Sequence, residues 1–212
     1  MMIVFFVLIA FAVSIMGGFL MNGNDMLNKR SGISNTDAGT IVMMILLVNI
    51  IASPAWAFLK EKVKHKRRLL PIPAIILGID LVVLYLLPED PNPGTYAMAY
   101  IGFILLGIWD GGLIILVMGS IPLMVPKEVR ALAFSVYTIG LGVGLGIQPI
   151  IIGKIIDSAG PDNQAGGYKN CYYLYFGEYV FVIGGLFYLA LTNHWQAKLI
   201  DTPSSKSSEG SK

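Results

Sequence analysis

The chain has 212 residues, of which 55% are hydrophobic and 13% charged, and its mean hydropathy is +0.70. This composition excludes a soluble globular domain, whose surface would have to be mostly polar. The net charge of +2 is too small to indicate a nucleic-acid partner, and the single cysteine, Cys171, can form neither an internal disulfide nor a thiolate zinc cluster.

Six long apolar runs predict six membrane-spanning helices, because each is close to the ~20 residues that a helix needs to cross ~30 Å of hydrocarbon. The runs cover residues 2–21, 41–59, 69–87, 96–118, 131–153 and 172–191. We therefore expect an all-α membrane protein with one six-helix domain, residues 1–192. Residues 193–212 are serine-rich and polar, which predicts a disordered cytoplasmic tail.

The first run has two interpretations. It has no basic lead-in and is longer than the apolar part of a typical secretory signal, which favours a spanning helix. Gly17 and Gly18 are small residues of the kind found at cleavage sites, so a signal peptide stays open as the alternative. A chain that opens directly inside a helix is also what a fragment or a shortened gene model would give.

The lysines and arginines between the runs predict the orientation. With six spans, eleven of these residues fall on one side and four on the other, and cytoplasmic loops carry the excess. Both termini are therefore expected in the cytoplasm. The four are Lys29, Arg30, Lys154 and Lys169, and the eleven include the basic stretch from Lys60 to Arg68. His65 and His194 have no second ligand at metal-binding spacing, so we expect no metal and no cofactor.

Three acidic residues lie inside the predicted spans, where an ionisable side chain needs a partner or a water-filled cavity. Asp110 is the deepest, and its neighbours Trp109, Gly111 and Gly112 offer an aromatic face and close backbone approach. This combination favours binding of a polar or cationic solute group over a purely structural role. A structural role is preferred for the other two acids, Asp80 and Glu178.

Asn49 and Gln148 are neutral polar residues at membrane depth, which could bind a solute or simply link helices. The fifth run also contains two overlapping pairs of small residues, Gly140 with Gly144 and Gly142 with Gly146, followed by Pro149. Such a pattern suits close packing and bending, as a moving wall of a transport pathway would require, and a static packed helix is the open alternative. Tyr137 and Gln148 could then point into that pathway.

A short repeat suggests two triplets of helices. The second run ends with Ala57 and, four residues later, Glu61; the fifth ends with Gly153 and, four residues later, Asp157. These positions are equivalent if the helices are counted three plus three. The sequence thus predicts two inverted three-helix repeats.

Four segments resemble the carboxy-terminal half of major facilitator superfamily transporters. The main one is SPAWAFLKEKVKHKRR at residues 53–68, which is similar to the cytoplasmic loop between two helices of that half. Residues 35–39, 125–135 and 153–157 extend the similarity, which is strongest to lysosomal dipeptide transporters of the superfamily. The loop departs from the family pattern, since Ala57 and Lys64 replace glycines and Glu61 replaces an aspartate.

The resemblance implies a twelve-helix fold of two six-helix halves that transports by alternating access. For the lysosomal branch it implies dipeptide uniport and a glycosylated lysosomal membrane protein as partner. In the family arrangement, the first, second, fourth and fifth helices of this half line the cavity. That favours a substrate site of Asp110, Trp109, Asn49, Tyr137 and Gln148, and leaves Asp80 and Glu178 on supporting helices.

The charged pair Glu61 and Lys62 matches the superfamily loop, where the resemblance implies that it locks the cytoplasmic gate. Arg130 is the expected partner of Glu61, since an acid is also favoured near a helix amino terminus. For residues 64–68 a role as a topology signal is preferred over gating.

We therefore expect a secondary transporter, or half of one, that moves a small organic solute together with a second six-helix half. That half would be a missing segment or another copy of the chain. A membrane scaffold or assembly protein would use the same helices only for packing. An intramembrane enzyme is not expected, because Asp80 and Asp110 could pair but lie in no catalytic motif.

Overall fold

The computed structural model describes residues 2–63, 69, 71–119 and 127–195 of the protein. Most of the basic stretch, with His65, lies outside this part of the chain, as do Val125 and Pro126 and residues 196–212 of the expected tail. The described residues form six α-helices: α1 (Met2–Ser31), α2 (Asn35–Lys62), α3 (Pro71–Tyr85), α4 (Pro93–Leu113), α6 (Arg130–Ser158) and α7 (Gln164–Trp195). A π-helical turn, η2 (Ile114–Met118), continues α4, and short 3-10 turns, η3 (Lys127–Val129) and η4 (Pro161–Asn163), precede α6 and α7.

Five of the six helices are longer at one or both ends than the apolar runs that predicted them. The first helix continues ten residues beyond its run, and α7 includes residues 193–195 of the expected tail. The helix α3, at 15 residues, is shorter than its run at both ends. Polar helix ends continue the backbone hydrogen-bond ladder, whereas hydropathy marks only the apolar part. Where the bilayer begins and ends on each helix stays a prediction.

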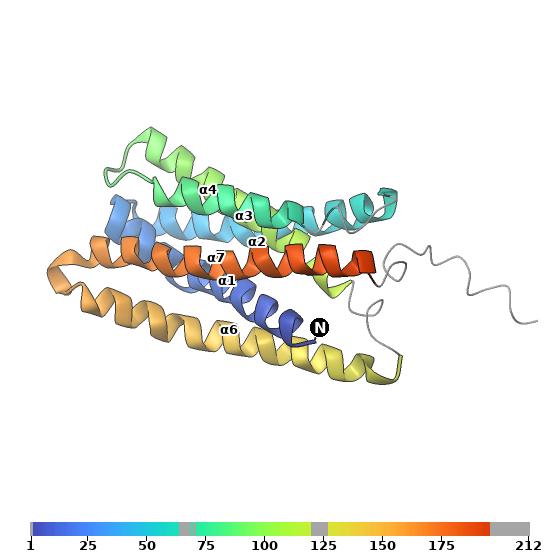
Figure 1. Ribbon diagram of the computed structural model, residues 1–212. Helices are drawn as coiled ribbons and strands as arrows, with labels where there is room; N and C mark the ends of the chain where they lie inside the picture. The colour runs from blue at the N-terminus through green and yellow to red at the C-terminus, as the bar shows by residue number, and fades with distance from the viewer. Residues whose placement is uncertain (1, 64–68, 70, 120–126, 196–212) are drawn as a thin grey trace, which may run out of the picture.

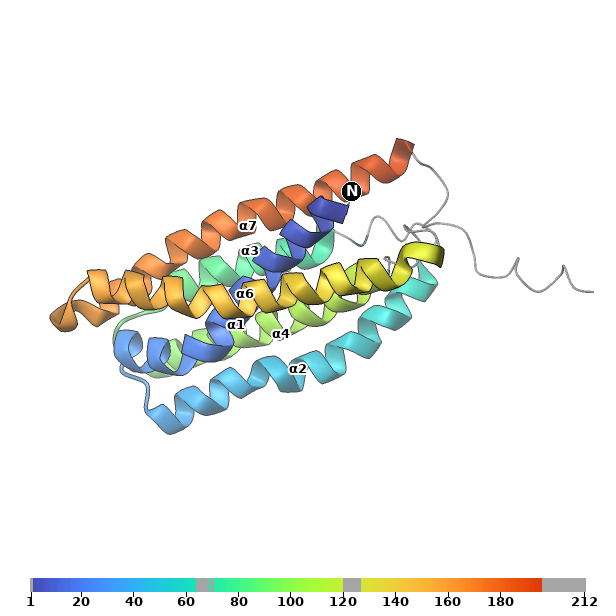
Figure 2. The ribbon, with the colours of Figure 1, turned by 90° about the horizontal axis from the view of Figure 1, so that it is seen from below.

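The helices lie lengthwise in one bundle and alternate in direction (Figure 1). At one end of the bundle α1, α3 and α6 begin and α2 and α7 end; at the other end the directions are reversed. From below, α2 and α7 form opposite edges with the other helices between them (Figure 2). The chain therefore enters and leaves the described bundle at the same end.

The six helices form two triplets, α1–α2–α3 and α4–α6–α7, and the main packing contacts are between helices of different triplets. The first helix of each triplet packs extensively on the second helix of the other, as α1 does on α6 and α4 on α2. Likewise α1 packs on α7, and α4 packs on α3. Glu61 and Asp157 are each the penultimate residue of the equivalent helices α2 and α6. The predicted inverted three-helix repeats are therefore present in the fold.

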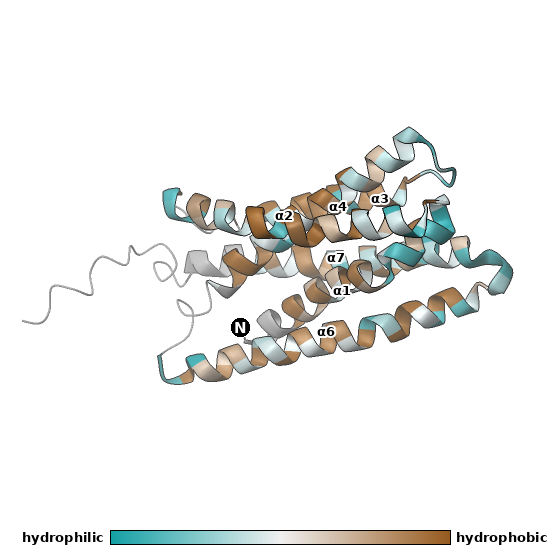
Figure 3. Cartoon of the chain, turned by 180° about the vertical axis from the view of Figure 1, so that it is seen from behind, coloured by the Kyte–Doolittle hydropathy of each residue, from teal (hydrophilic) through white to brown (hydrophobic). Residues whose placement is uncertain are grey.

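Four helical segments are long and apolar enough to cross a membrane: Val7–Ser31, Asn35–Lys62, Pro93–Val117 and Lys127–Ser158. The apolar helix α3 is shorter than these, and α7 is not among them within the described residues. Hydropathy is highest along the middle of the bundle and lowest at its two ends (Figure 3). This distribution is that of a multi-pass membrane protein.

Arg30 joins three helices at the end of the bundle where α1 finishes. Its guanidinium donates to the carbonyl oxygens of Leu84 at 2.9 Å, Tyr85 at 2.5 Å and Leu87 at 3.2 Å, at the end of α3. It also lies over the ring of Tyr172 on α7, 5.1 Å from the centroid. A cation favours the negative end of a helix, so this residue, which the sequence pattern indicates only as a loop charge, stabilises the fold.

Candidate functional site

Asp110 lies in a polar cluster between α2 and α4. The side-chain amide of Asn49 donates to Oδ2 of Asp110, and Ser53 Oγ donates to Asn49 Oδ1 at 2.8 Å. Asn49 and Ser53 are four residues apart on α2, so they occupy the same face of that helix. We call these three residues the Asp110 cluster. The structure thus brings together two residues of the predicted site, Asn49 and Asp110, and adds Ser53.

Glycines on α4 allow α2 to come close enough to make these contacts. A Cβ atom at Gly107 would lie 2.7 Å from the carbonyl oxygen of Ile45, and one at Gly111 would lie 3.1 Å from the Ser53 nitrogen. At Gly112 it would lie 2.7 Å from the Trp56 ring. The close approach that we expected at Gly111 and Gly112 is therefore made by α2, and the space beside them is not left open for a solute.

The other predicted substrate residues occupy different surroundings. Trp109 is fully buried, with 0% of its surface exposed, and its indole nitrogen has no hydrogen-bond partner among the described residues. Tyr137 is buried on α6, a helix that packs mainly on α1 and α7.

Gln148 belongs to a second polar group, between α1, α6 and α7. Ser14 Oγ lies 2.9 Å from Glu178 Oε1, and Gln148 Nε2 lies 3.1 Å from Glu178 Oε2. Ser14 Oγ also contacts Gln148 Oε1, which closes a ring of three side chains. All three are buried. We call this group the Glu178 ring; the sequence placed Gln148 with Asp110, whereas its hydrogen bonds join it to Glu178.

The fifth run's glycines divide between two faces of α6. Gly144 packs on α1, where an added Cβ would lie 2.5 Å from the carbonyl oxygen of Ala10. Gly142 and Gly146 lie on the opposite side, with nothing within 4 Å of such an atom. The pair that includes Gly144 therefore provides the close packing that was expected, next to the Glu178 ring.

Asp80 on α3 is fully buried, and neither of its carboxyl oxygens has a hydrogen-bond partner in the described part of the chain. The Asp80–Asp110 pair that an intramembrane enzyme would need is therefore not formed. A Cβ atom added at Gly102 of α4 would lie 3.3 Å from Asp80 Oδ1, so this carboxyl group packs at the α3–α4 contact.

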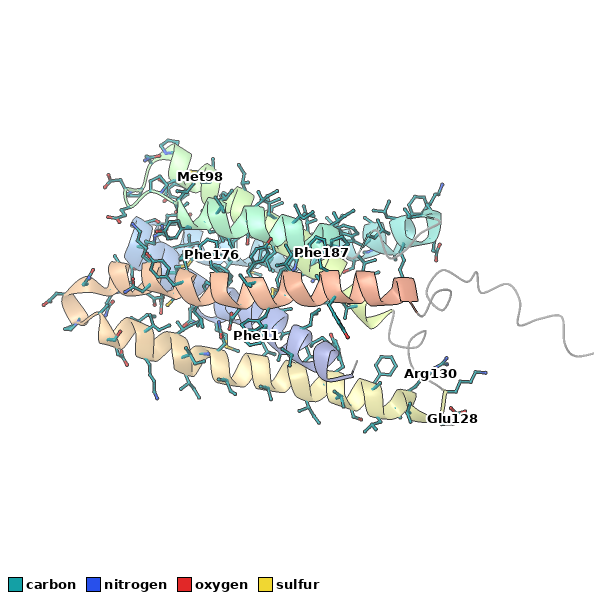
Figure 4. All side chains as sticks on the ribbon, in the orientation of Figure 1. Phe11, Met98, Glu128, Arg130, Phe176 and Phe187 are labelled. Carbon is teal, nitrogen blue, oxygen red and sulfur yellow. The ribbon has the colours of Figure 1, made fainter. Side chains whose placement is uncertain are left out.

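The predicted gate residues lie at one end of the bundle. Glu61 and Lys62 are exposed in the last turn of α2, and Lys62 lies 4.8 Å from the centroid of the Phe58 ring. Arg130 begins α6 at the same end (Figure 4). Within the described structure no ion pair joins Glu61 to Arg130, so the expected pair is not formed in this conformation. Instead Lys60 donates to the carbonyl oxygen of Ile115 in η2 at 3.2 Å.

The start of α2 carries another expected feature, the segment of residues 35–39. Ser34 caps the helix by accepting from the backbone of Asp37 at 3.2 Å, and its hydroxyl donates to the Asp37 carboxylate at 2.8 Å. Tyr96 of α4 donates to the same carboxylate at 3.3 Å. This segment therefore fixes the start of α2 against α4.

Sequence reasoning missed Ser14, Ser53, Arg30 and Lys60 as contact residues. Ser14 could have been found as a hydroxyl in the middle of an apolar run. Its partners could not, because they depend on how three helices are rotated about their axes.

The chain matches the family model of the Major Facilitator Superfamily over residues 2–210. No curated protein matches it at a significant level. The family match agrees with the six-helix arrangement and its exchanged packing. The chain therefore belongs to the major facilitator superfamily, a family of membrane transporters rather than enzymes.

Proposed function

We propose that this chain forms one six-helix half of a secondary transporter for a small organic solute, with the Asp110 cluster as the binding group for a cationic part of that solute. The observation that carries the proposal is the open end of the cluster. One carboxyl oxygen of Asp110 accepts from Asn49, and the other accepts no hydrogen bond from the described residues. A carboxylate with a free oxygen suits an ammonium group.

The hydrogen bonds of the cluster are compatible with a charged Asp110. Ser53 supplies the hydrogen for Asn49, and Asn49 supplies the hydrogen for Asp110, so neither contact needs a proton on the carboxyl group. Asp110 also keeps 7% of its surface exposed. A charged residue at membrane depth that forms no ion pair and is not fully buried is a candidate for a substrate pathway.

The exposed faces of α2 and α6 support a second half as partner. Both helices expose many large apolar side chains and contribute few residues to the core. Lipid could cover such faces, but these two helices also carry Asn49 and Tyr137 of the predicted substrate site. In alternating access the substrate site lies at the interface between repeats, so these helices should face the second half. The exposed apolar residues are Met43, Leu46, Leu47, Ile50, Ile51, Phe58 and Leu59 on α2, and Leu132, Phe134, Ile139, Val143, Leu145, Ile147, Ile150 and Ile151 on α6.

Dipeptides are the first solutes to test, because they combine an ammonium group with a carboxylate and because residues 53–68 resemble the loop of lysosomal dipeptide transporters. The same resemblance makes a lysosomal or other endomembrane residence, cytoplasmic termini and a glycosylated accessory protein part of the proposal. The end of the bundle that carries Glu61, Lys62 and Arg130 would then be the cytoplasmic gate.

The test is uptake of labelled dipeptides and amino acids into vesicles that contain the full chain. Removing the charge of Asp110 with Asp110→Asn should lower uptake about 10- to 100-fold, because a hydrogen bond between charged groups contributes ~1.5–3 kcal/mol. Asp80→Asn is the matched control, since it changes a buried carboxyl group outside the cluster.

Uptake that is the same in wild type and Asp110→Asn would remove Asp110 from the binding site. Binding to other membrane proteins without uptake of any solute by the wild type would favour the alternative, a non-transporting scaffold or assembly protein.

A further inference from the structure

The Glu178 ring has three polar contacts, but Ser14 and Gln148 can supply hydrogen atoms for only two of them. Its three contacts are Ser14 with Gln148, Ser14 with Glu178, and Gln148 with Glu178. Each contact needs one hydrogen atom between its two polar atoms. The hydroxyl of Ser14 has a single hydrogen. The amide of Gln148 donates only through its nitrogen, which faces one neighbour, while its oxygen faces the other. Two hydrogens are therefore available for three contacts.

The missing hydrogen must come from Glu178. With a proton on Oε1, Glu178 donates to Ser14, Ser14 donates to Gln148 Oε1, and Gln148 donates to Glu178 Oε2. Reversing the amide of Gln148 does not change the count, because the oxygen would then face Glu178 and would again need a hydrogen. An ionised Glu178 leaves two oxygen atoms in contact without a hydrogen in either orientation.

The surroundings of Glu178 offer no cation that would hold it as a carboxylate. Its partners from α1 and α6, Ser14 and Gln148, are neutral, and within the described chain it forms no ion pair. On its own helix the neighbouring ionisable side chains are Tyr175 and Tyr179, which bring no positive charge. The ionisable groups of α3, the remaining helix packed on α7, are Asp80 and Tyr85, which bring no positive charge.

The cations of these helices lie at their ends. Lys154 is the nearest along α6, about 9 Å from Gln148 at ~1.5 Å per residue, and Lys169 lies about 13 Å from Glu178 along α7 by the same measure. On α1, Lys29 and Arg30 are in the last turn, and Arg30 is engaged with α3. A charged Glu178 would be buried and unpaired, which the membrane interior strongly disfavours.

We propose that the Glu178 ring is a proton-binding site, occupied in this conformation, and that its proton is the coupling ion of transport. The coupling part rests on the proposed function. When the proton is released to water, only two hydrogen atoms remain for the three contacts of the ring. One contact is then lost, so α1, α6 and α7 must separate locally or admit water. Uptake from the opposite side restores the ring. Proton exchange is thereby tied to the movement of α6, the helix that also carries Tyr137.

Infrared difference spectroscopy of the full chain in lipid tests the proton site without any need for transport. Wild type minus Glu178→Gln should show the carbonyl band of a protonated carboxylic acid at neutral pH. Glutamine is a suitable replacement because its amide can donate to Ser14 and accept from Gln148, which keeps all three contacts. A spectrum without that band would overturn the proposal.

Uptake driven by a pH gradient tests the coupling. A gradient of one unit should raise the accumulation of solute by wild type up to about tenfold per proton, and Glu178→Gln should not respond to it. If wild type takes up solute to the same extent with and without the pH gradient, the coupling is contradicted and the proposed function is not. A carboxylic acid band in a protein that transports no solute would support the proton site and contradict the proposed function.

Discussion

The Asp110 cluster and the Glu178 ring use the same kinds of side chain in opposite ways. Each contains a carboxyl group, an amide and a serine hydroxyl that contact one another between helices. The Asp110 cluster is an open chain, in which every contact has its hydrogen and one carboxyl oxygen is left over. The Glu178 ring is closed, and its contacts are complete only if the acid is neutral. The number and direction of hydrogen bonds therefore decide the charge of a buried carboxyl group.

The two groups also differ in how tightly the surrounding helices enclose them. The Asp110 cluster joins two helices, and Asn49 keeps part of its surface exposed. The Glu178 ring joins three helices, and its members Ser14, Gln148 and Glu178 are 6%, 1% and 5% exposed. An open group can meet a solute, whereas a closed group can only respond to a ligand as small as a proton.

The largest expected effect concerns the packing that holds the ring closed. Gly144→Val should destabilise the protein by about 3 kcal/mol, because overpacking forces backbones apart and the new Cβ would lie 2.5 Å from Ala10 O and 3.1 Å from the Ser14 nitrogen. Gly142→Val is the control, since its Cβ would meet nothing within 4 Å. Thermal unfolding in lipid should separate the two variants, and equal melting temperatures would contradict the close α1–α6 contact.

A smaller loss is expected when the ring itself is broken. Gln148→Leu removes two of the three contacts of the ring and leaves Glu178 Oε2 without a partner, which should cost about 2 kcal/mol since the group is buried. The measurement is again thermal unfolding of the full chain. A leucine variant as stable as wild type would mean that these three side chains do not form a closed ring.

Removal of a hydroxyl from the open cluster should have less effect. Ser53→Ala removes one hydrogen bond to a half-buried amide, so we expect about 1 kcal/mol. Ser135→Ala is the matched control, because Ser135 is exposed and its hydroxyl donates only within its own helix, to Ala131 at 3.0 Å. If both alanine variants unfold together with wild type, Ser53 does not support Asn49.

The smallest change in stability is expected for Glu178→Gln. An amide and a protonated acid offer the same donors and acceptors to Ser14 and Gln148, so the free energy of unfolding should change by less than about 0.5 kcal/mol at neutral pH. If Glu178 were ionised, the substitution would remove a charge from the protein interior. A marked gain in stability at neutral pH would therefore count against the protonated ring.

The sequence predicted the helices because membrane solvation acts on composition, and apolar runs of sufficient length must become helices. It also predicted the inverted repeat from Glu61 and Asp157, whose helices α2 and α6 are equivalent in the packing. It could not predict that α1 continues to Ser31, because Arg30 reads as a loop charge until its contacts with the end of α3 are known.

For the candidate site, the sequence identified Asn49 and Asp110 separately, and the structure joins them. It grouped Gln148 with Asp110, whereas the hydrogen bonds of Gln148 are to Ser14 and Glu178, because a residue's neighbours depend on how its helix is rotated against its partners. Glu178 was assigned a structural role, because a carboxyl group on a supporting helix carries no sign of its hydrogen-bond partners. Roles in binding and gating stay predictions.

The most direct measurement compares access to the two groups with a water-soluble, membrane-impermeant thiol reagent. The only native cysteine, Cys171, is buried and can be replaced by serine to give a silent background. In that background the account predicts that Asn49→Cys reacts with the reagent and is protected by solute, whereas Ser14→Cys does not react. Equal labelling at both positions, or labelling of Ser14→Cys alone, would contradict an open Asp110 cluster beside a closed Glu178 ring.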